Sequence, residues 1–132
     1  MITHNTDYLK AAIFITFSGN CKKALSFYQT CFGGELHFET LDQALPGFTE
    51  TPVVSGSLVA DRIIIHGSDL VHSEGRKVGK YLSIFLRCTN AADRLLLKKK
   101  LERNNNKSTD RVEKAALIEV TDAFDVRWML SV

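Results

Sequence analysis

One pattern occurs twice in this chain, and it limits the possible folds more than any other feature. Residues 11–17 form a β-rich apolar run, residues 18–20 a turn, and residues 21–32 an amphipathic helix that two glycines terminate. About seventy residues later, a second β-rich run at 81–88 precedes a second helix, which indicates an internal repeat. Two copies of one strand, one helix and three further strands, each about sixty-five residues long, account for the chain length of 132 residues.

Both helices begin at an asparagine. The side chains of Asn20 and Asn90 are each expected to accept a hydrogen bond from an unpaired amide of the first helical turn. Asp93 stands in the first turn of the second helix, where the helix dipole favours a negative charge. Apolar residues recur in each helix at spacings of one, three and four, which predicts one buried stripe per helix. We expect the core to contain Phe14, Ala24, Leu25, Tyr28, Phe32, Ile84, Leu86, Leu95 and Leu96.

The predicted fold class is α+β, with two βαβββ units in a single glyoxalase-like domain that spans residues 1–132. The units cover about residues 10–68 and 79–132. Each unit is expected to form a curved mixed sheet with its helix on the outer face, and the other two faces to line a concave cleft, the default place for a ligand. Strands are expected at 11–17, 35–41, 53–60, 62–67, 80–87, 113–121 and 126–131, and helices at 21–32 and 91–103. Residues 42–52, 68–79 and 104–110 are expected to be loops, and a turn at 122–125 to join the last two strands.

Composition excludes several kinds of partner. Apolar residues make up 45% of the chain and charged residues 24%, which is ordinary for a globular protein. A formal net charge of +2 gives no electrostatic basis for binding nucleic acid or a membrane surface. No apolar run approaches the roughly twenty residues that span a bilayer, and residues 1–10 lack the apolar region of a signal peptide. We therefore expect a cytoplasmic protein with no nucleic-acid and no membrane partner.

The three cysteines do not have the spacing of a metal site. The chain has an odd number of cysteines, namely Cys21, Cys31 and Cys88. An odd number favours reduced structural thiols in a reducing compartment. Cys21 is the exception to consider, because a helix N-terminus is able to lower the pKa of a thiol. No partner base for it is evident in the sequence.

Several segments together resemble one superfamily. They are residues 17–21 with Ala24 and Leu25, then Phe27-Tyr28, residues 31–35, residues 64–69, and Asp122-Ala123-Phe124 with Val126 and Trp128. This set resembles the vicinal oxygen chelate superfamily, which includes glyoxalase I, extradiol dioxygenases and the bleomycin- and fosfomycin-resistance proteins, and within it the PhnB-like branch. The chain departs from that branch at Asp125, where glycine is usual, and at 107–114, which replaces a tryptophan-glycine stretch. It also lacks the glycine-rich cofactor loop that a methyltransferase needs.

The resemblance implies a binding site for a divalent metal, but this chain has poor metal ligands at the corresponding positions. In the superfamily the ligands come from the first and fourth strands of each unit, which the repeat places at Ile13, Ile64, Ser83 and Met129. None of these side chains is a good ligand for a hard or borderline divalent ion. A shift of the alignment by two residues brings His66 into the cleft, but one histidine does not make a site. We therefore predict no metal and no cofactor.

No catalytic residue can be named from the sequence, and three weak candidates stand out. His37 and Glu39 alternate on one face of a strand, so they are either an acid–base pair that faces the cleft or part of a solvated face. His66 is the third candidate, or a histidine at the rim. A basic patch consists of residues 98–100 with Arg103. It either contacts an anion or is a solvated helix face, and the neighbouring acidic residue Glu102 favours the solvated face.

The function expected from this resemblance is that of a PhnB-like protein that binds a small, partly apolar molecule without a catalytic metal. Whether it is an enzyme or sequesters its ligand, as the bleomycin-resistance relatives do, stays open. The alternative is a metal-dependent lyase, isomerase or dioxygenase-type enzyme of the same superfamily. Exposed sheet edges also favour a homodimer. The expected cleft residues are Ile13, Ile15, Phe17, Ile64, His66, Ser83, Phe85 and Met129.

Overall fold

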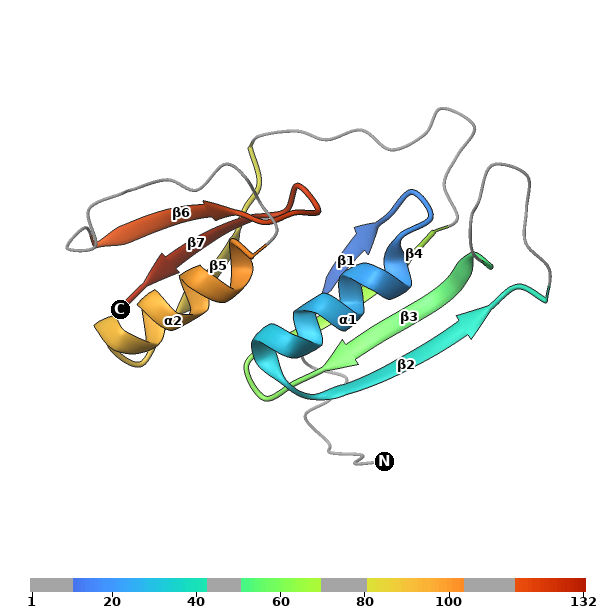
Figure 1. Cartoon of the computed structure of the whole chain (residues 1–132), viewed down its shortest axis with the longest axis horizontal. Coiled ribbons are helices and arrows are strands. Elements are labelled where there is room, and N and C mark those ends of the chain that lie inside the picture. Colours follow the sequence, from blue (N-terminus) through green and yellow to red (C-terminus); the bar gives the residue numbers. More distant parts are fainter. Residues whose placement is uncertain (1–10, 43–50, 70–80, 104–115) are drawn as a thin grey trace. The chain divides into compact units, whose positions relative to one another are not determined.

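The computed structural model describes residues 11–42, 51–69, 81–103 and 116–132, and it divides into two compact units (Figure 1). Each unit has its own mixed sheet and one helix. The first unit contains β1 (Ile13–Thr16), α1 (Cys21–Phe32), β2 (Glu35–Thr40), β3 (Val53–Val59) and β4 (Ile64–Ser68). The second contains β5 (Ile84–Arg87), α2 (Ala91–Leu101), β6 (Leu117–Thr121) and β7 (Arg127–Ser131). Neither described helix combines the length and the apolar character that crossing a bilayer would require.

The strand order repeats from one unit to the other. The first sheet has the order β1-β4-β3-β2 and the second has the order β5-β7-β6. β1 pairs in parallel with β4 as β5 does with β7, and the other pairs are antiparallel. The second unit therefore repeats β1, α1, β3 and β4 of the first. The described second unit is βαββ, and residues 104–115, between α2 and β6, lie outside the described residues.

The two helices begin in different ways. Asn90 caps α2 as expected, because its side chain accepts a hydrogen bond from the amide of Asp93 at 2.8 Å, and Asp93 in turn accepts one from the amide of Thr89 at 2.9 Å. Asn20 makes no side-chain capping bond. The first turn of α1 is bound instead by Asp69, whose Oδ1 accepts from the amide of Cys21. The prediction that the side chain of Asn20 caps α1 is therefore wrong.

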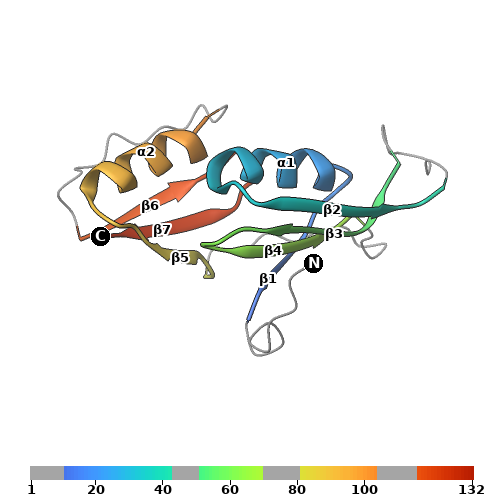
Figure 2. The same ribbon diagram turned by 90° about the horizontal axis from the view of Figure 1, so that it is seen from below.

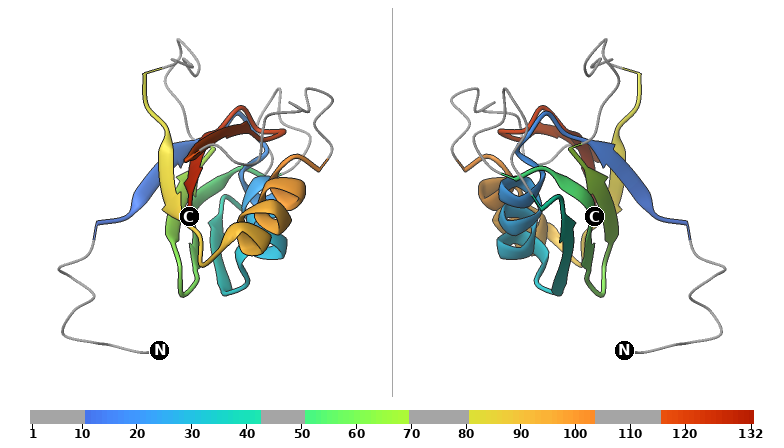
Figure 3. Two further views of the ribbon diagram at one scale, coloured as in Figure 1. Left: turned by 90° about the vertical axis from the view of Figure 1, so that its left-hand side faces the viewer. Right: turned by 90° about the vertical axis from the view of Figure 1, so that its right-hand side faces the viewer.

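Two glycines allow α1 to lie close to its sheet. α1 contacts β2, β3 and β4, and Figures 2 and 3 show it on one side of these strands. A Cβ atom at Gly56 would lie 3.0 Å from Cδ1 of Leu25, and one at Gly67 would lie 2.9 Å from the ring of Phe17. Both positions therefore face the helix, where a side chain would overpack the core.

The buried stripes differ in part from those expected. Ala24, Leu25, Tyr28 and Leu86 are buried, whereas Phe32, Ile84 and Leu95 are half-buried. Phe14 is 64% exposed and Leu96 is 54% exposed, so their assignment to the core is wrong. Ile13 and Ile15 face the helix side of β1. Because successive strand residues point to opposite faces, Phe14 points away from the helix. On α2 the buried positions are Arg94, Leu97, Lys98 and Leu101.

Truncating Leu25 should destabilise the protein far more than truncating Leu96. Leu25 is fully buried and Leu96 is largely exposed, although both are helical leucines. Leu25→Ala should reduce the free energy of unfolding by about 2–5 kcal/mol, and Leu96→Ala by less than about 0.5 kcal/mol. Urea unfolding followed by circular dichroism measures both. Equal losses in the two variants would show that the buried face of one helix is misassigned.

Candidate functional site: the helix-free faces of the two sheets

In the first sheet, one row of side chains crosses all four strands on the face opposite α1. Phe14 pairs in register with His66, His66 with Ser57, and Ser57 with His37. Gly56 and Gly67, each next in sequence to a member of this row, face α1, so the row itself points the other way. The helix-free face of the first sheet therefore carries a phenylalanine, a serine and two histidines in line.

The environment of this row is apolar at one end and polar at the other. Phe14 is largely exposed beside His66, and Val59 pairs with Ile64 on the same face. Soluble proteins seldom leave neighbouring apolar side chains open to water without a binding role. Such a surface suits a molecule that has an apolar part and a polar group.

The predicted acid–base residues lie on this face, but they do not form a catalytic cluster. Nε2 of His37 lies 3.7 Å from Oε2 of Glu35, and both side chains are exposed to water. β3 lies between the strands of His66 and His37, which places the backbones of the two histidines about 10 Å apart at the usual strand spacing. In the described part of the chain, no three His, Cys, Asp or Glu side chains gather as a metal site.

Three residues of the expected cleft set, two in β1 and one just after it, lie on the helix side of the first sheet. Ile13 pairs with Ile65, which is fully buried, and Ile15 pairs with Gly67 beneath α1. Phe17 is itself completely buried and would contact any side chain at Gly67. In the first unit the helix-free face therefore carries Ile64 and His66 from the expected set, together with Phe14, which sequence reasoning placed in the core.

The second sheet has a comparable face. Phe85, Met129 and Glu119 form a row across β5, β7 and β6, and the next row, Leu86, Leu130 and Ile118, is buried. Phe85 is 56% exposed and Met129 is half-buried, while Ser83 lies exposed just before β5. Nε of Arg127 donates to Oε2 of Glu119 at 2.7 Å across the strands. The face is thus apolar with one ion pair at its edge.

Two buried carboxylates, Asp69 and Asp122, belong to the segments on which the family resemblance rests, and both have a structural role. Asp69 accepts three backbone hydrogen bonds, from the amides of Gly19 and Cys21 at 2.9 Å and of Val53 at 3.0 Å. Asp122 accepts from the amides of Phe124 and Val126 and from the indole of Trp128. Both carboxylates are buried, so they hold turns in place and do not face a ligand. Sequence reasoning named both residues but missed this role.

Cys21 is not an activated thiol. Burial, with a smaller contribution from the negative charge of Asp69, raises the pKa of Cys21 to about 12. The thiol is therefore protonated at neutral pH, and the effect of burial exceeds that of the helix N-terminus. Cys21, Cys31 and Cys88 are all buried and none is in a disulfide, as expected for structural cysteines.

The basic patch of α2 separates into two environments. Lys98 is only 8% exposed, and its Nζ lies 2.9 Å from Oε1 of Glu102. Lys99 and Arg103 are exposed, as expected for a solvated helix face. The interpretation of residues 98–100 with Arg103 as a wholly solvated face is therefore wrong for Lys98.

No family model matches the chain, and no curated protein matches it in sequence. Among solved structures, protein PA1353 from Pseudomonas aeruginosa aligns with a TM-score of 0.72 and 26% identity over 92% of this chain and 96% of that chain. A putative 3-demethylubiquinone-9 3-methyltransferase from Bacillus cereus, named PhnB protein, aligns with a TM-score of 0.66 and 18% identity over 92% and 98%. The Arabidopsis thaliana gene product At5g48480 aligns with a TM-score of 0.57 and 16% identity over 93% and 98%. These likenesses confirm the predicted glyoxalase-like α+β fold class.

Proposed function

We propose that this chain is a PhnB-like protein that binds a small, partly apolar molecule on the helix-free face of a sheet, without a catalytic metal. The observation that carries the proposal is the exposure of Phe14 in line with His66 on the face of the first sheet opposite α1. A buried phenylalanine typically contributes about 1.5–3 kcal/mol, so an exposed one leaves that contribution available to a ligand. His66 offers a hydrogen-bonding group beside it.

Phe85 supports the proposal from the second sheet. It is largely exposed, and its register partner Met129 is a flexible side chain that adapts to irregular ligands. The likeness to the Bacillus cereus PhnB protein gives the same fold around these faces. Neither sheet brings acid, base and nucleophile together among the described residues, which favours binding over catalysis.

A thermal-shift screen with small aromatic and hydrophobic metabolites tests this function. A ligand at about 100 times its Kd should stabilise the protein by about 2.7 kcal/mol. Phe14→Ser should weaken a ligand that binds on the first sheet, and Phe85→Ser one that binds on the second, by about tenfold or more, since each loses a buried aromatic contact. Leu96→Ser is the matched control, because Leu96 is as exposed as Phe85 but lies on α2. Equal weakening by Leu96→Ser, or none by either phenylalanine variant, contradicts the proposal.

The absence of a catalytic metal is a separate prediction. The repeat placed the ligand positions of the superfamily at Ile13, Ile64, Ser83 and Met129, none of which is a good metal ligand. The structure puts Ile13 on the helix side of β1, and Phe14, its neighbour on the helix-free face, has no donor atom for a metal either. A zinc site needs about three or four protein donors. Elemental analysis after dialysis without chelator should find well under one zinc, nickel, iron or manganese per chain. A stoichiometric metal that His66→Ala removes would favour the metal-dependent lyase, isomerase or dioxygenase instead. The homodimer and the cytoplasmic location stay predictions.

A further inference from the structure

The helix-free faces of the two sheets are alike at one position and differ at another. β5 pairs in parallel with β7 as β1 does with β4, and the first strand of each unit carries a largely exposed phenylalanine, Phe14 or Phe85. The row of Phe14 continues to Ser57 on β3, whereas the row of Phe85 continues to Glu119 on β6. The second unit therefore places a carboxylate where the first unit has a hydroxyl group.

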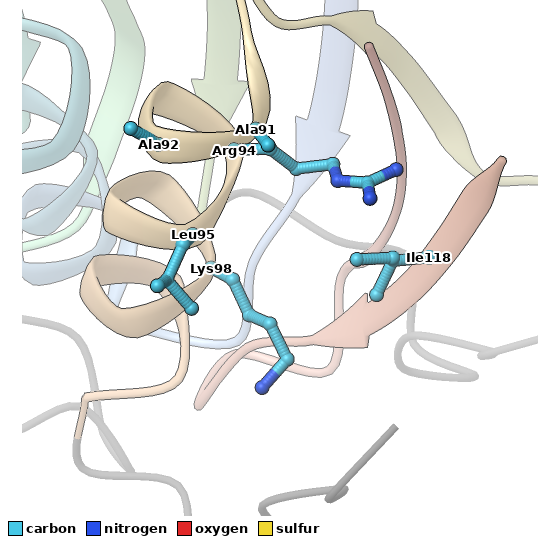
Figure 4. A pocket seen from close by; sticks show the side chains of 6 residues that line it. All are labelled: Ala91, Ala92, Arg94, Leu95, Lys98 and Ile118. Carbon is cyan, nitrogen blue, oxygen red and sulfur yellow. The ribbon is translucent and has the colours of Figure 1, made fainter. Parts of the chain in front are cut away.

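Glu119 lies on the face of the second sheet opposite α2. Figure 4 shows Ile118, the preceding residue of β6, pointing toward α2, where it lines a small pocket with residues of the helix. Successive strand residues point to opposite faces, so Glu119 points away from α2, to the same side as its register partner Met129. The side chain of Glu119 is 36% exposed. A molecule that lies on this face therefore reaches the carboxylate.

Arg127 holds the carboxylate of Glu119 through only one of its two oxygens. Nε of Arg127 donates to Oε2 at 2.7 Å, and Nη2 contacts the same oxygen. The two residues are diagonal neighbours on adjacent strands, a separation that long side chains bridge. In the described part of the chain, both contacts of Glu119 end at Oε2, so Oε1 keeps its capacity to accept hydrogen bonds. A carboxylate that is already held loses little rotamer freedom when a ligand binds to it.

The charge of this pair favours a neutral ligand. The guanidinium of Arg127 compensates for the carboxylate of Glu119, so the pair has no net charge that would attract an organic cation. Arg87, the other charged side chain that the structure describes on this face, is exposed, and water screens an exposed charge. A neutral N–H donor satisfies Oε1 without bringing a further charge out of water, which would be costly.

The apolar part of the row stands beside this acceptor. Met129 is half-buried between Phe85 and Glu119, and directly opposite residues of adjacent strands have their Cβ atoms about 4.5–5.5 Å apart. Aromatic rings pack on one another offset or edge to face, and a thioether sulfur makes favourable contacts with a ring edge. A planar ring on Phe85 and Met129 therefore has its edge within reach of the carboxylate.

We propose that the helix-free face of the second sheet binds a neutral aromatic molecule with an N–H donor on its ring. Oε1 of Glu119 accepts this hydrogen bond, and the ring lies on Phe85 and Met129. Glu119 is then the residue that determines specificity. This inference rests on the proposed function, and it names the class of ligand for one of the two sheets.

Indole and 1-methylindole test the proposal on the whole chain, because the methyl group replaces the hydrogen of the ring N–H. Indole should raise the melting temperature and bind about tenfold more tightly than 1-methylindole, since a hydrogen bond to a charged acceptor is of the stronger kind. Glu119→Ala should weaken indole by about tenfold and leave 1-methylindole unchanged, so that the two affinities become nearly equal. A merely structural role of Glu119 would weaken both probes and leave their ratio in place.

Two further variants make the ratio specific to this carboxylate. Glu119→Gln keeps an amide oxygen as an acceptor, so part of the preference for indole should remain. Asp61→Ala removes an exposed carboxylate in the turn between β3 and β4 and should leave the ratio of the two affinities unchanged.

A measurement on the unmodified protein does not depend on the folding of any variant. Indole should shift the methyl NMR resonance of Met129 and leave those of Ile65, in the core of the first unit, in place. No shift at Met129, equal affinities of the two probes, or a ratio that Asp61→Ala changes as much as Glu119→Ala does would overturn the proposal. If Phe14→Ser removes the indole effect while Phe85→Ser does not, the probe lies on the first sheet, and this inference fails while the proposed function stands.

Discussion

Replacing Asp69 with alanine should strongly destabilise the first unit. The Asp69 carboxylate is 1% exposed and accepts hydrogen bonds from the amides of Gly19, Cys21 and Val53. Each buried donor that loses its partner costs about 1–3 kcal/mol. Asp69→Ala leaves two buried donors and one part-buried donor, the amide of Gly19, without this partner, so the free energy of unfolding should fall by about 3 kcal/mol or more. This is a large part of the roughly 5–15 kcal/mol that a domain has.

Two further variants make this test specific. Asp69→Asn keeps the size of the side chain and one acceptor oxygen. The free energy of unfolding should therefore fall by less than it does in Asp69→Ala. Asp61 is exposed in the turn between β3 and β4, and Asp61→Ala should change the free energy of unfolding by less than about 0.5 kcal/mol. Urea unfolding followed by circular dichroism measures all three. A loss below about 1 kcal/mol for Asp69→Ala would mean that the three amides find other partners.

Truncating Trp128 should have an effect of similar size in the second unit. Trp128 is completely buried, and its Nε1 donates to Oδ2 of Asp122 at 2.9 Å. Trp128→Ala should reduce the free energy of unfolding by about 3–5 kcal/mol, because it removes the largest side chain of this core and leaves a cavity. Phe85→Ala truncates an aromatic residue on the opposite face of the same sheet and should cost less than about 1 kcal/mol.

Trp128→Phe separates the packing of the indole from its hydrogen bond. Phenylalanine keeps much of the apolar contact but leaves Oδ2 of Asp122 without the indole donor, which should cost about 1–3 kcal/mol. In an Asp122→Asn background the additional cost of Trp128→Phe should be smaller, since the two side chains interact directly. Strictly additive losses in this double-mutant cycle would show that the indole hydrogen bond contributes nothing.

The local structure of the chain was predictable because local preferences determine it. α1 spans Cys21–Phe32 as the apolar stripe predicted, and Gly33, with a φ of 73°, follows its last residue. The turn at 122–125 also lies where it was expected. Asp125 has a φ of 66°, which explains why glycine is usual there in the family that the chain resembles.

The side of each strand that faces the helix was not predictable from β1 alone. Ile13, Phe14 and Ile15 are all large and apolar, so alternation along the strand does not distinguish its two faces. The pairing of Ile13 with the buried Ile65 places Phe14 on the helix-free face. The expected cleft set therefore included Phe17 of the core and omitted Phe14.

The sequence by itself determined the repeat, the helices, the turns and the class of fold, because each depends on residues close together in the chain. The tertiary structure alone decided the roles of the charged residues. Asp69 binds the amide of Gly19, which is 50 positions away, and Lys98 is buried because α2 turns that side toward β6. Burial and hydrogen-bond partners set the energetics of a charge, and both depend on residues that only the folded chain brings together.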